Sequence, residues 1–161
     1  MSQQQELDQS TPAWQMKTFG MLSNTELYAL LQARVSVFVL EQNCAYQELD
    51  GLDASGLHLW CAEPDGGVLA YARLLPPGKR FAEASIGRVL TTQAARGSGL
   101  GKQLMTQAIR TAQGQYGHGS GIRISAQCYL ERFYADFGFK AVGERYLEDD
   151  IPHQEMFRQA D

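Results

Sequence analysis

The segment RGSGLG, residues Arg96 to Gly101, places three glycines between a strand-like apolar run and a helical pattern. The run covers residues 84–91, and apolar residues at helical spacing start at Leu100. The first turn of a helix has backbone N–H groups without intrahelical partners and the positive end of the helix dipole, so it binds anions where side chains leave room. Glycine leaves that room. The order strand, glycine-rich turn, helix therefore predicts a phosphate-binding loop in an α/β fold.

The residues of this loop discriminate among phosphate-binding motifs. A Walker A loop needs glycine and serine or threonine where Arg96 and Gln103 stand. A dinucleotide fingerprint needs a third glycine where this chain has lysine or leucine. The pattern (Q/R)xxGx(G/A) fits, with Arg96, Gly99 and Gly101 at its fixed positions. This pattern resembles the pyrophosphate loop of acetyl-coenzyme A binders.

A second motif strengthens that resemblance. FYADFGF, residues Phe133 to Phe139, is similar to the (F/L)YxxxGF segment of the GNAT superfamily of N-acetyltransferases. The chain also resembles the ElaA-type branch of that family through several shorter segments. These are VFVLEQ (37–42), DGLD (50–53), GRV (87–89), AQ (126–127) and IPH (151–153).

The resemblance implies a single-domain α/β fold with a mixed, mostly antiparallel sheet, flanked by helices and with splayed central strands. The strands that splay correspond to residues 84–91 and 122–127. We expect the acetyltransferase domain to cover residues 13–161. The polar, glutamine-rich start, residues 1–12, is expected to be disordered.

The apolar pattern predicts the same order of elements. The strands are residues 13–19, 57–62, 68–75, 84–91, 122–127, near 140–146 and near 154–158. Helices are predicted after a capping box of Ser23 and Glu26, over 37–42, from Leu100, and over 130–137. Residues 43–56 are predicted to be a loop and part of the acceptor wall.

The resemblance also assigns residues to acetyl-coenzyme A as cosubstrate. Backbone groups of Val89 and Thr91 would pair with the pantetheine arm, and the Leu90 N–H would polarise the thioester carbonyl. The phosphate loop would comprise Arg96, Gly97, Ser98, Gly99, Leu100, Gly101 and Lys102.

Direct attack of an amine on a thioester needs few protein groups, because binding both reactants in line supplies much of the rate. Tyr134 is the candidate general acid, since its phenol stays protonated at neutral pH and the resemblance puts it beside the sulfur. Many relatives carry a glutamate base on the fourth strand, where this chain has Gly87 and Arg88. The remaining base candidates are His153 and Glu83. His58 has the same intrinsic suitability.

The acceptor side is predicted to use Glu41, Asp50 and Asp53, which could bind the amine or order water, together with Arg88. The acceptor class stays open among small molecules, peptide N-termini and lysine side chains. Two other readings stay open: a non-catalytic acyl-coenzyme A sensor module and a nucleotide-binding protein.

Composition narrows the setting. There are 14 Lys and Arg against 18 Asp and Glu, a net charge of −4, so we expect no nucleic-acid partner. No apolar run reaches the roughly 20 residues of a membrane span, and the first ten residues lack signal-peptide features, so a cytoplasmic location without membrane contact is expected. The three cysteines have no metal-binding spacing, so we expect no metal and reduced thiols. The resemblance makes a homodimer conceivable.

Overall fold

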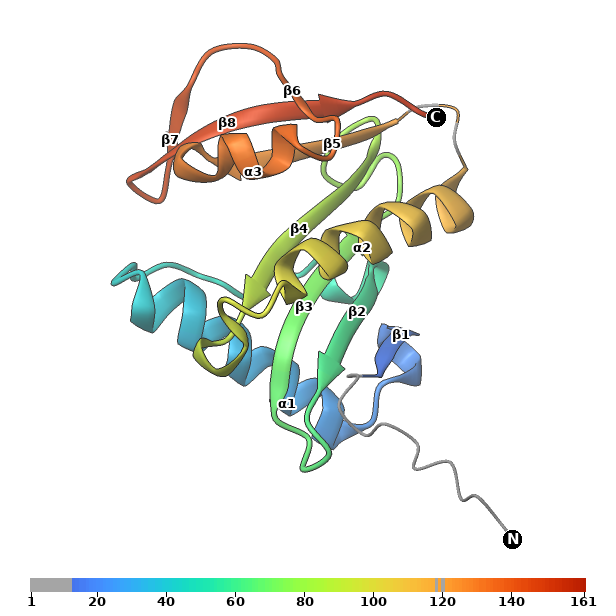
Figure 1. Cartoon of the computed structure of the whole chain (residues 1–161), viewed down its shortest axis with the longest axis vertical. Coiled ribbons are helices and arrows are strands. Elements are labelled where there is room, and N and C mark those ends of the chain that lie inside the picture. The colour runs from blue at the N-terminus through green and yellow to red at the C-terminus, as the bar shows by residue number, and fades with distance from the viewer. Residues whose placement is uncertain (1–12, 118, 120) are drawn as a thin grey trace, which may run out of the picture.

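The computed structural model describes residues 13–117, 119 and 121–161, and this part of the chain contains one eight-stranded sheet (Figure 1). The strand order is β1-β2-β3-β4-β5-β8-β6, and β7 pairs with β8 outside this path. The strands are β1 (Trp14–Thr18), β2 (Leu57–Ala62), β3 (Val68–Leu75), β4 (Ala84–Thr91), β5 (Ile122–Gln127), β6 (Lys140–Ala141), β7 (Tyr146–Glu148) and β8 (Ile151–Arg158).

All strand pairs are antiparallel except β4 and β5, which run parallel at the centre. Only two residue pairs join these strands, Ala84 with Ile122 and Ser85 with Arg123. Beyond them β4 and β5 diverge, so β5 to β8 form the separate upper block of Figure 1. The predicted splay of the central strands is confirmed.

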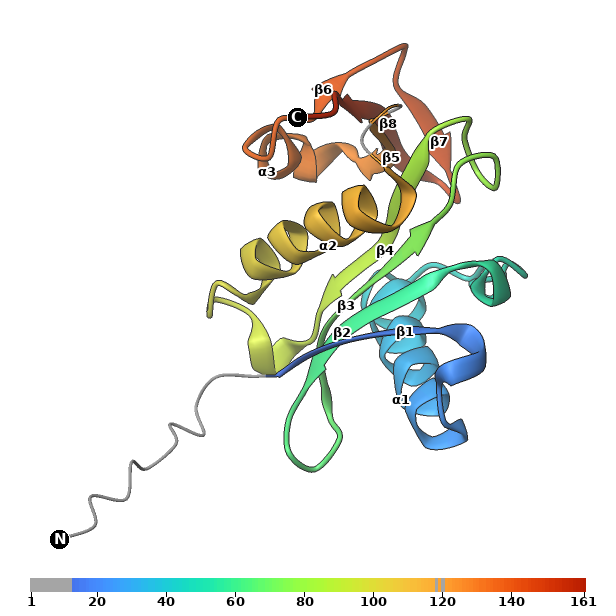
Figure 2. The same cartoon turned by 90° about the vertical axis from the view of Figure 1, so that its right-hand side faces the viewer.

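Helices cover both faces of the sheet (Figure 2). Helix α1 (Asn24–Val35) and the π-helix η2 (Ser36–Glu41) lie on one face, where Leu30, Val37 and Phe38 pack on Trp60 and Tyr71. Helix α2 (Leu100–Tyr116) and the short α3 (Glu131–Ala135) lie on the other. None of the described helices combines the length and the apolar character that a membrane span requires.

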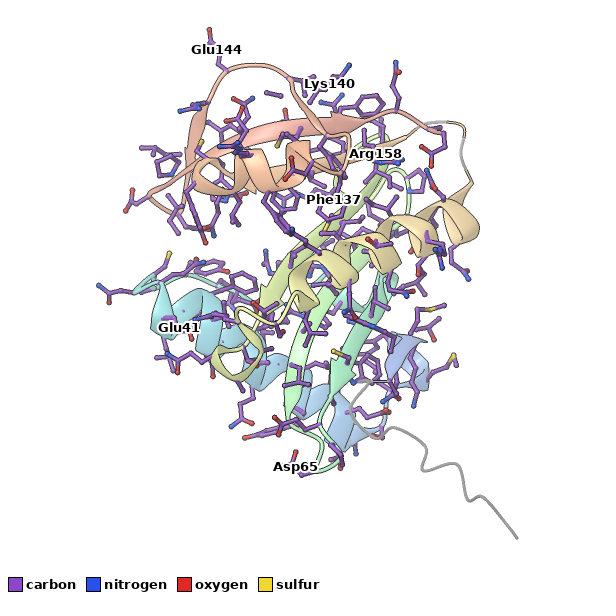
Figure 3. All side chains as sticks on the ribbon, viewed as in Figure 1. Glu41, Asp65, Phe137, Lys140, Glu144 and Arg158 are labelled. Carbon is purple, nitrogen blue, oxygen red and sulfur yellow. The ribbon has the colours of Figure 1, made fainter. Side chains whose placement is uncertain are left out.

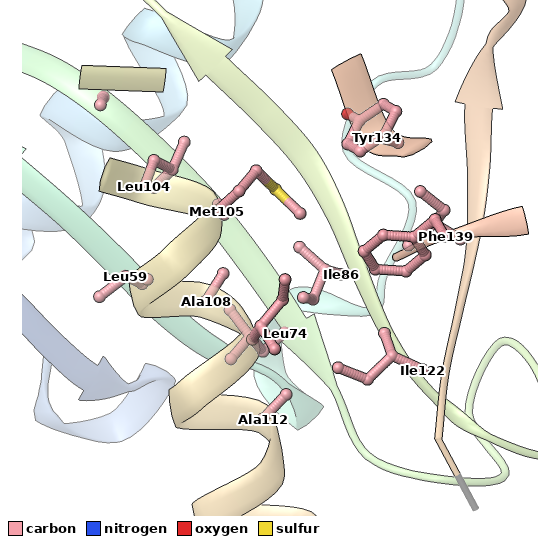
Figure 4. Packing of buried hydrophobic residues seen from close by; sticks show 14 of the residues in the cluster. Leu59, Leu74, Ile86, Leu104, Met105, Ala108, Ala112, Ile122, Tyr134 and Phe139 are labelled. Atoms are coloured by element: carbon pink, nitrogen blue, oxygen red, sulfur yellow. The ribbon is translucent and has the colours of Figure 1, made fainter. Parts of the chain in front are cut away.

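The larger core lies between α2, α3 and the sheet (Figure 4). One stripe of α2 is buried there: Leu100, Leu104, Met105, Ala108, Ile109 and Ala112. It meets inward residues of the strands, such as Leu59, Leu74 and Ile86. The 3.6-residue period of this stripe is what the sequence pattern predicted.

Local signals explain the element ends. Ser23 and Glu26 form a capping box at the start of α1, since Ser23 Oγ accepts from the Glu26 N–H and Glu26 Oε1 accepts from the Ser23 N–H. At Gly121 (φ +71°), just before β5, a Cβ would overlap the carbonyl oxygen of Arg158. Glycine there lets the start of β5 pair closely with the end of β8.

The C-terminal predictions need correction. The helix predicted over 130–137 is a 3₁₀ turn, η5 (Cys128–Leu130), followed by five α-helical residues. The strand predicted over 140–146 is split into β6 and β7, and β8 begins at Ile151 rather than near 154. The buried side chain of Gln154 donates to the carbonyls of Val142 and Gly143, which holds this segment outside the ladder. Residues 1–12, predicted to be disordered, lie outside the described residues.

Candidate active site

A cavity of about 830 Å³ opens where β4 and β5 diverge. It is lined by residues of both strands, of the RGSGLG loop and of the C-terminal strands. A volume of this size is typical of a site for a cofactor or drug-sized ligand. The lining includes Glu41, Asp50, Arg88, Val89, Thr91, Arg96, Gly101, Tyr134 and His153 among the residues predicted from sequence.

The RGSGLG loop has the backbone that anion binding needs. Gly97 (φ +80°) and Gly99 (φ +83°) adopt the left-handed conformation, which costs other residues about 1–2 kcal/mol. Gly99 is the N-cap of α2. Within the described part of the chain, the N–H groups of Gly97, Gly99, Gly101 and Lys102 have no hydrogen-bond acceptor. These donors and the helix dipole form a cradle that fits a phosphate group.

Arg96 of this loop is held by the π-helix η2. Its guanidinium pairs with the Glu41 carboxylate at 2.5 Å and donates to the Thr91 carbonyl oxygen at 3.1 Å. Figure 3 shows Glu41 on η2, beside the loop that precedes α2. Isolated π-helical turns are frequent at functional sites. Here the π-helix brings Val37, Phe38 and Glu41 to the cavity wall.

Tyr134 lies on α3 and lines the cavity. Its ring packs edge-on against Phe133 and Phe139, with centroids 5.2 and 6.1 Å away. Burial raises its pKa, and nearby Tyr129 adds to the rise. Within the described residues its hydroxyl has no hydrogen-bond partner. Tyr134 is therefore a protonated residue of the cavity lining. Figure 4 shows it beside Phe139.

The C-terminal wall carries a polar cluster around Glu148. Its carboxylate accepts from Arg80 at 2.9 Å and lies 3.3 Å from His153 Nε2. The other ring nitrogen of His153 donates to the Ile151 carbonyl oxygen at 2.7 Å. Tyr146 stacks on the His153 ring at 6.0 Å. The cluster therefore orients an imidazole and a carboxylate on one cavity wall.

Ser125 joins the Glu148 cluster from the neighbouring strand β5. Its hydroxyl hydrogen-bonds the Tyr146 hydroxyl and lies 3.5 Å from the Glu148 carboxylate. Glu148, Arg80, Tyr146 and Ser125 were not predicted from sequence. Ser125 of β5 meets Tyr146 and Glu148 of β7 because both strands pair with β8, and Arg80 joins them from the loop between β3 and β4.

Another part of the cavity lining belongs to a largely buried network of three arginines and three carboxylates. Arg34 on α1 binds Glu48 at 2.7 and 3.1 Å. It also binds Asp53 at 2.6 Å. Arg73 on β3 binds Asp50 with a two-pronged contact at 2.8 Å and binds Asp53 at 3.0 Å. Charges balance within this cluster, as buried ions require.

The network ends at the cavity. Arg88 on β4 donates to both Glu48 and Asp50, and it lines the cavity together with Asp50 and Arg73. Burial raises the pKa of Asp50, but hydrogen bonds from Arg73 and the Leu52 N–H outweigh it. The resulting pKa lies well below the ordinary aspartate value.

Asp53 follows the same pattern. Burial raises its pKa, and the hydrogen bonds and charges of Arg34 and Arg73 lower it more, so the balance is a lowered pKa. His58, hydrogen-bonded to the Tyr71 hydroxyl at 2.8 Å and to the Asp53 carbonyl oxygen at 3.0 Å, has a pKa lowered by burial. All three groups hold fewer protons in the folded state than in the unfolded state at acidic pH.

We therefore expect the protein to lose stability in two stages as the pH is lowered from 7. The contribution of His58 is present above its unfolded pKa of about 6.5 and is lost below it, and those of Asp50 and Asp53 decline below about pH 4. Thermal midpoints measured between pH 7 and pH 3 test this. Asp50→Asn should lower the thermal midpoint at pH 7 and make it depend less on pH below about pH 4. An unchanged midpoint down to pH 3 would contradict the expectation.

The structure separates the sequence-predicted residues into two groups. Those that meet at the cavity are Glu41, Asp50, Arg88, Val89, Thr91, Arg96, Gly101, Tyr134 and His153. The rest do not line it. Glu83 pairs with Arg123 at 2.5 Å. Asp53 lies in the network of arginines and carboxylates, and His58 hydrogen-bonds the Asp53 carbonyl oxygen. The Leu90 side chain packs in the core beneath α1. Of the RGSGLG loop and Lys102, only Arg96 and Gly101 line the cavity. The other predicted residues here are their neighbours in sequence: Gly97, Ser98, Gly99, Leu100 and Lys102.

Comparison with known proteins agrees with this geometry. The acetyltransferase (GNAT) domain family matches residues 24–159. Protein ElaA of Escherichia coli strain K12 is 41% identical over 148 residues, covering 91% of this chain and 95% of that protein. Its crystal structure superimposes with a TM-score of 0.86 at 38% identity, covering 92% of this chain and all (100%) of that one.

A second solved structure superimposes with the same TM-score. The acyl-CoA N-acyltransferase from Pseudomonas aeruginosa is 47% identical, with a TM-score of 0.86, and covers 92% of this chain and 99% of its own. The family match, the shared fold and the cavity between the splayed strands agree with one another. The chain belongs to the GNAT acetyltransferase family and is an ElaA-like acyltransferase.

Proposed function

We propose that this protein transfers an acetyl group from acetyl-coenzyme A to a primary amine by direct attack. One observation carries the proposal: Gly101 of the RGSGLG loop, Tyr134, and the Glu148 and His153 pair all line one cavity. A carrier with a phosphate group and a reactive thioester could meet all three groups there. We also propose that the protein acts in the cytoplasm.

The residues at the loop end fit coenzyme A. The four unpartnered N–H groups and the left-handed glycines suit the pyrophosphate, and Lys102 adds positive charge at the start of α2. The backbone of Val89 to Thr91 borders the gap where β4 has left β5, so polar groups on that edge, other than the Thr91 carbonyl oxygen that Arg96 occupies, would pair with the pantetheine arm. The bound thioester supplies an acyl carbon already activated toward amines.

In the proposed reaction the amine nitrogen bonds to the acyl carbon and the carbon–sulfur bond breaks. Tyr134 donates its proton to the departing thiolate and regains one from solvent. An acceptor that binds as an ammonium must lose one proton before the attack and another after it. The His153 and Glu148 pair, 3.3 Å apart on the acceptor wall, is the proposed route for those protons.

Asp50 is proposed to contribute to the acceptor side through its charge, since it lines the cavity while paired with Arg73. Glu41, predicted from sequence for the same side, pairs with Arg96 of the RGSGLG loop and so belongs to the coenzyme end of the proposal. A small-molecule or peptide amine fits the acceptor side. A homodimer is compatible with the proposal. A non-catalytic sensor of acyl-coenzyme A is the alternative, and it shares the cradle but has no use for the Tyr134 hydroxyl or the His153 pair.

Thermal unfolding with separate additions of acetyl-coenzyme A, coenzyme A and ATP tests the carrier. A ligand at 100 times its Kd stabilises by about 2.7 kcal/mol, which raises the midpoint of a chain of this size by about 5–10 °C. We expect that rise with both coenzymes and none with ATP. A rise with ATP alone would contradict the proposal.

Gly99→Asp provides the matching loss of binding. Aspartate tolerates the left-handed backbone, and no atom lies within 4 Å of the added Cβ, so the fold should persist while the new charge repels phosphate. The midpoint rise should vanish. Gly66→Asp, at another left-handed glycine with open space in the β2–β3 turn, should keep the rise. Equal behaviour of the two variants would refute the cradle.

A further inference from the structure

Arg88 has a backbone conformation that is unusual for its position. Its φ is +51°, and among the described non-glycine residues it is the one inside a strand with positive φ. Residues with a Cβ reach this region only when surrounding contacts hold them there, and such residues cluster at functional sites. The neighbouring residue, Gly87, could adopt it freely, yet the positive angle falls on Arg88.

The conformation coincides with a break in the sheet register. In the β3–β4 ladder Tyr71 faces Leu90 and Arg73 faces Gly87, so Ala72 faces both Arg88 and Val89. Two residues opposite one define a β-bulge, which bends its strand and redirects its backbone groups. The bulge lies beyond Ser85, the last residue of β4 that pairs with β5. It therefore shapes the segment of β4 that borders the cavity.

The Arg88 side chain is fixed at three points. Its Nε donates to the Glu48 carboxylate at 2.8 Å, and one terminal nitrogen donates to the Glu48 carbonyl oxygen at 2.9 Å and to Asp50 at 3.3 Å. The guanidinium also lies 5.9 Å from the centroid of the Tyr46 ring. These contacts leave the group committed to the protein rather than to a ligand.

The acceptors that hold Arg88 are themselves bound by other arginines. Glu48 is 3% exposed and bound by Arg34, and Asp50 is bound on both oxygens by the buried Arg73. These ion pairs connect the Arg88 guanidinium of β4 to the 48–53 loop and, through it, to helix α1 and strand β3. A rigid anchor of this kind can hold a strained backbone.

We infer that Arg88 is a positioning residue whose guanidinium, anchored by Glu48 and Asp50, pins the bulge of β4 and so orients the backbone of Val89 to Thr91 for the thioester arm. This inference rests on the proposed function. It gives Arg88 a different role from the acceptor contact predicted from sequence. It also predicts which part of the coenzyme depends on Arg88: the pantetheine end and not the nucleotide end.

Calorimetric titration of purified protein with two probes tests the inference. Acetyl-coenzyme A occupies both ends of the site, and 3′,5′-adenosine diphosphate occupies the nucleotide end alone. Arg88→Ala should weaken acetyl-coenzyme A about tenfold, as expected when main-chain hydrogen bonds to a ligand are misaligned, and leave the diphosphate unchanged. Arg145→Ala, which removes the exposed Arg145–Glu131 pair at 3.0 Å, should change neither.

Two further variants separate the backbone from the side chain. Arg88→Gly permits the positive φ without the anchor, and it should lose affinity as Arg88→Ala does. Arg88→Lys keeps a cation beside Glu48 but lacks the forked guanidinium donors. It serves as the test variant if Arg88→Ala and Arg88→Gly do not fold. It should lose several-fold in affinity for acetyl-coenzyme A and none for the diphosphate.

Each contrary result has a distinct meaning. Full affinity of Arg88→Gly for acetyl-coenzyme A, or an equal loss of both probes in any variant, would overturn the anchoring role. Unchanged binding of both probes by Arg88→Ala would do the same and return Arg88 to the acceptor side. Failure of the unmodified protein to bind acetyl-coenzyme A would refute the proposed function itself, and the inference with it.

Discussion

Replacing Glu48 by glutamine is expected to lower the free energy of unfolding by about 3–5 kcal/mol. The Glu48 carboxylate is buried and accepts hydrogen bonds from Arg34 and Arg88. A glutamine of the same shape removes the negative charge and turns an amide donor toward guanidinium donors. Arg34, fully buried, would then share Asp53 with Arg73 as its remaining counter-charge. Such uncompensated buried charge is among the largest single-residue costs known.

Urea unfolding at pH 7 measures this loss, and the thermal midpoint should fall by about 10 °C for a chain of this length. Glu131→Gln is the matched control, because it removes a carboxylate from the exposed pair with Arg145 at 3.0 Å. Its cost should stay below about 1 kcal/mol. Similar losses in the two variants would show that burial does not decide the strength of these pairs.

Much of the fold could be predicted from the sequence because its signals are local. The capping box at Ser23, the stripe along α2 and the glycine-rich loop each depend on residues within one or two turns. The C-terminal segment was predicted less well. There the break between β6 and β7 depends on the buried side chain of Gln154, which lies about a dozen residues away from the carbonyls it binds.

The cavity residues divide in the same way. Arg96, Gly101 and Tyr134 belong to contiguous motifs, so the sequence pointed to them. Glu148 and Arg80 meet only through the pairing of distant strands, and a lone glutamate before two aspartates gives no signal. Arg88 was predicted near the cavity, but its anchor is formed by Glu48, which no motif includes.

Tyr134→Phe is expected to reduce kcat by about 10²-fold or more while leaving the Kd of acetyl-coenzyme A unchanged, the range that a positioned general acid contributes. Because burial raises the pKa of Tyr134, the phenol is a donor at every pH where the protein is folded, so the loss should be the same across that range. Thiol release from acetyl-coenzyme A in the presence of a panel of primary amines measures the rate.

The fold should tolerate this change, because within the described residues the Tyr134 hydroxyl has no partner to lose. Tyr116→Phe is the control: it removes a hydroxyl that donates to the Leu74 carbonyl oxygen at 3.3 Å, outside the cavity, and it should cost stability but not turnover.

If Tyr134→Phe kept full turnover at every pH, the thiolate would leave without this proton. If neither the unmodified protein nor Tyr134→Phe turned over any amine while both bound acetyl-coenzyme A, the result would favour a non-catalytic sensor over an enzyme acting on these amines. A loss confined to Tyr134→Phe would make the hydroxyl, rather than the aromatic packing that phenylalanine preserves, the group that the reaction requires.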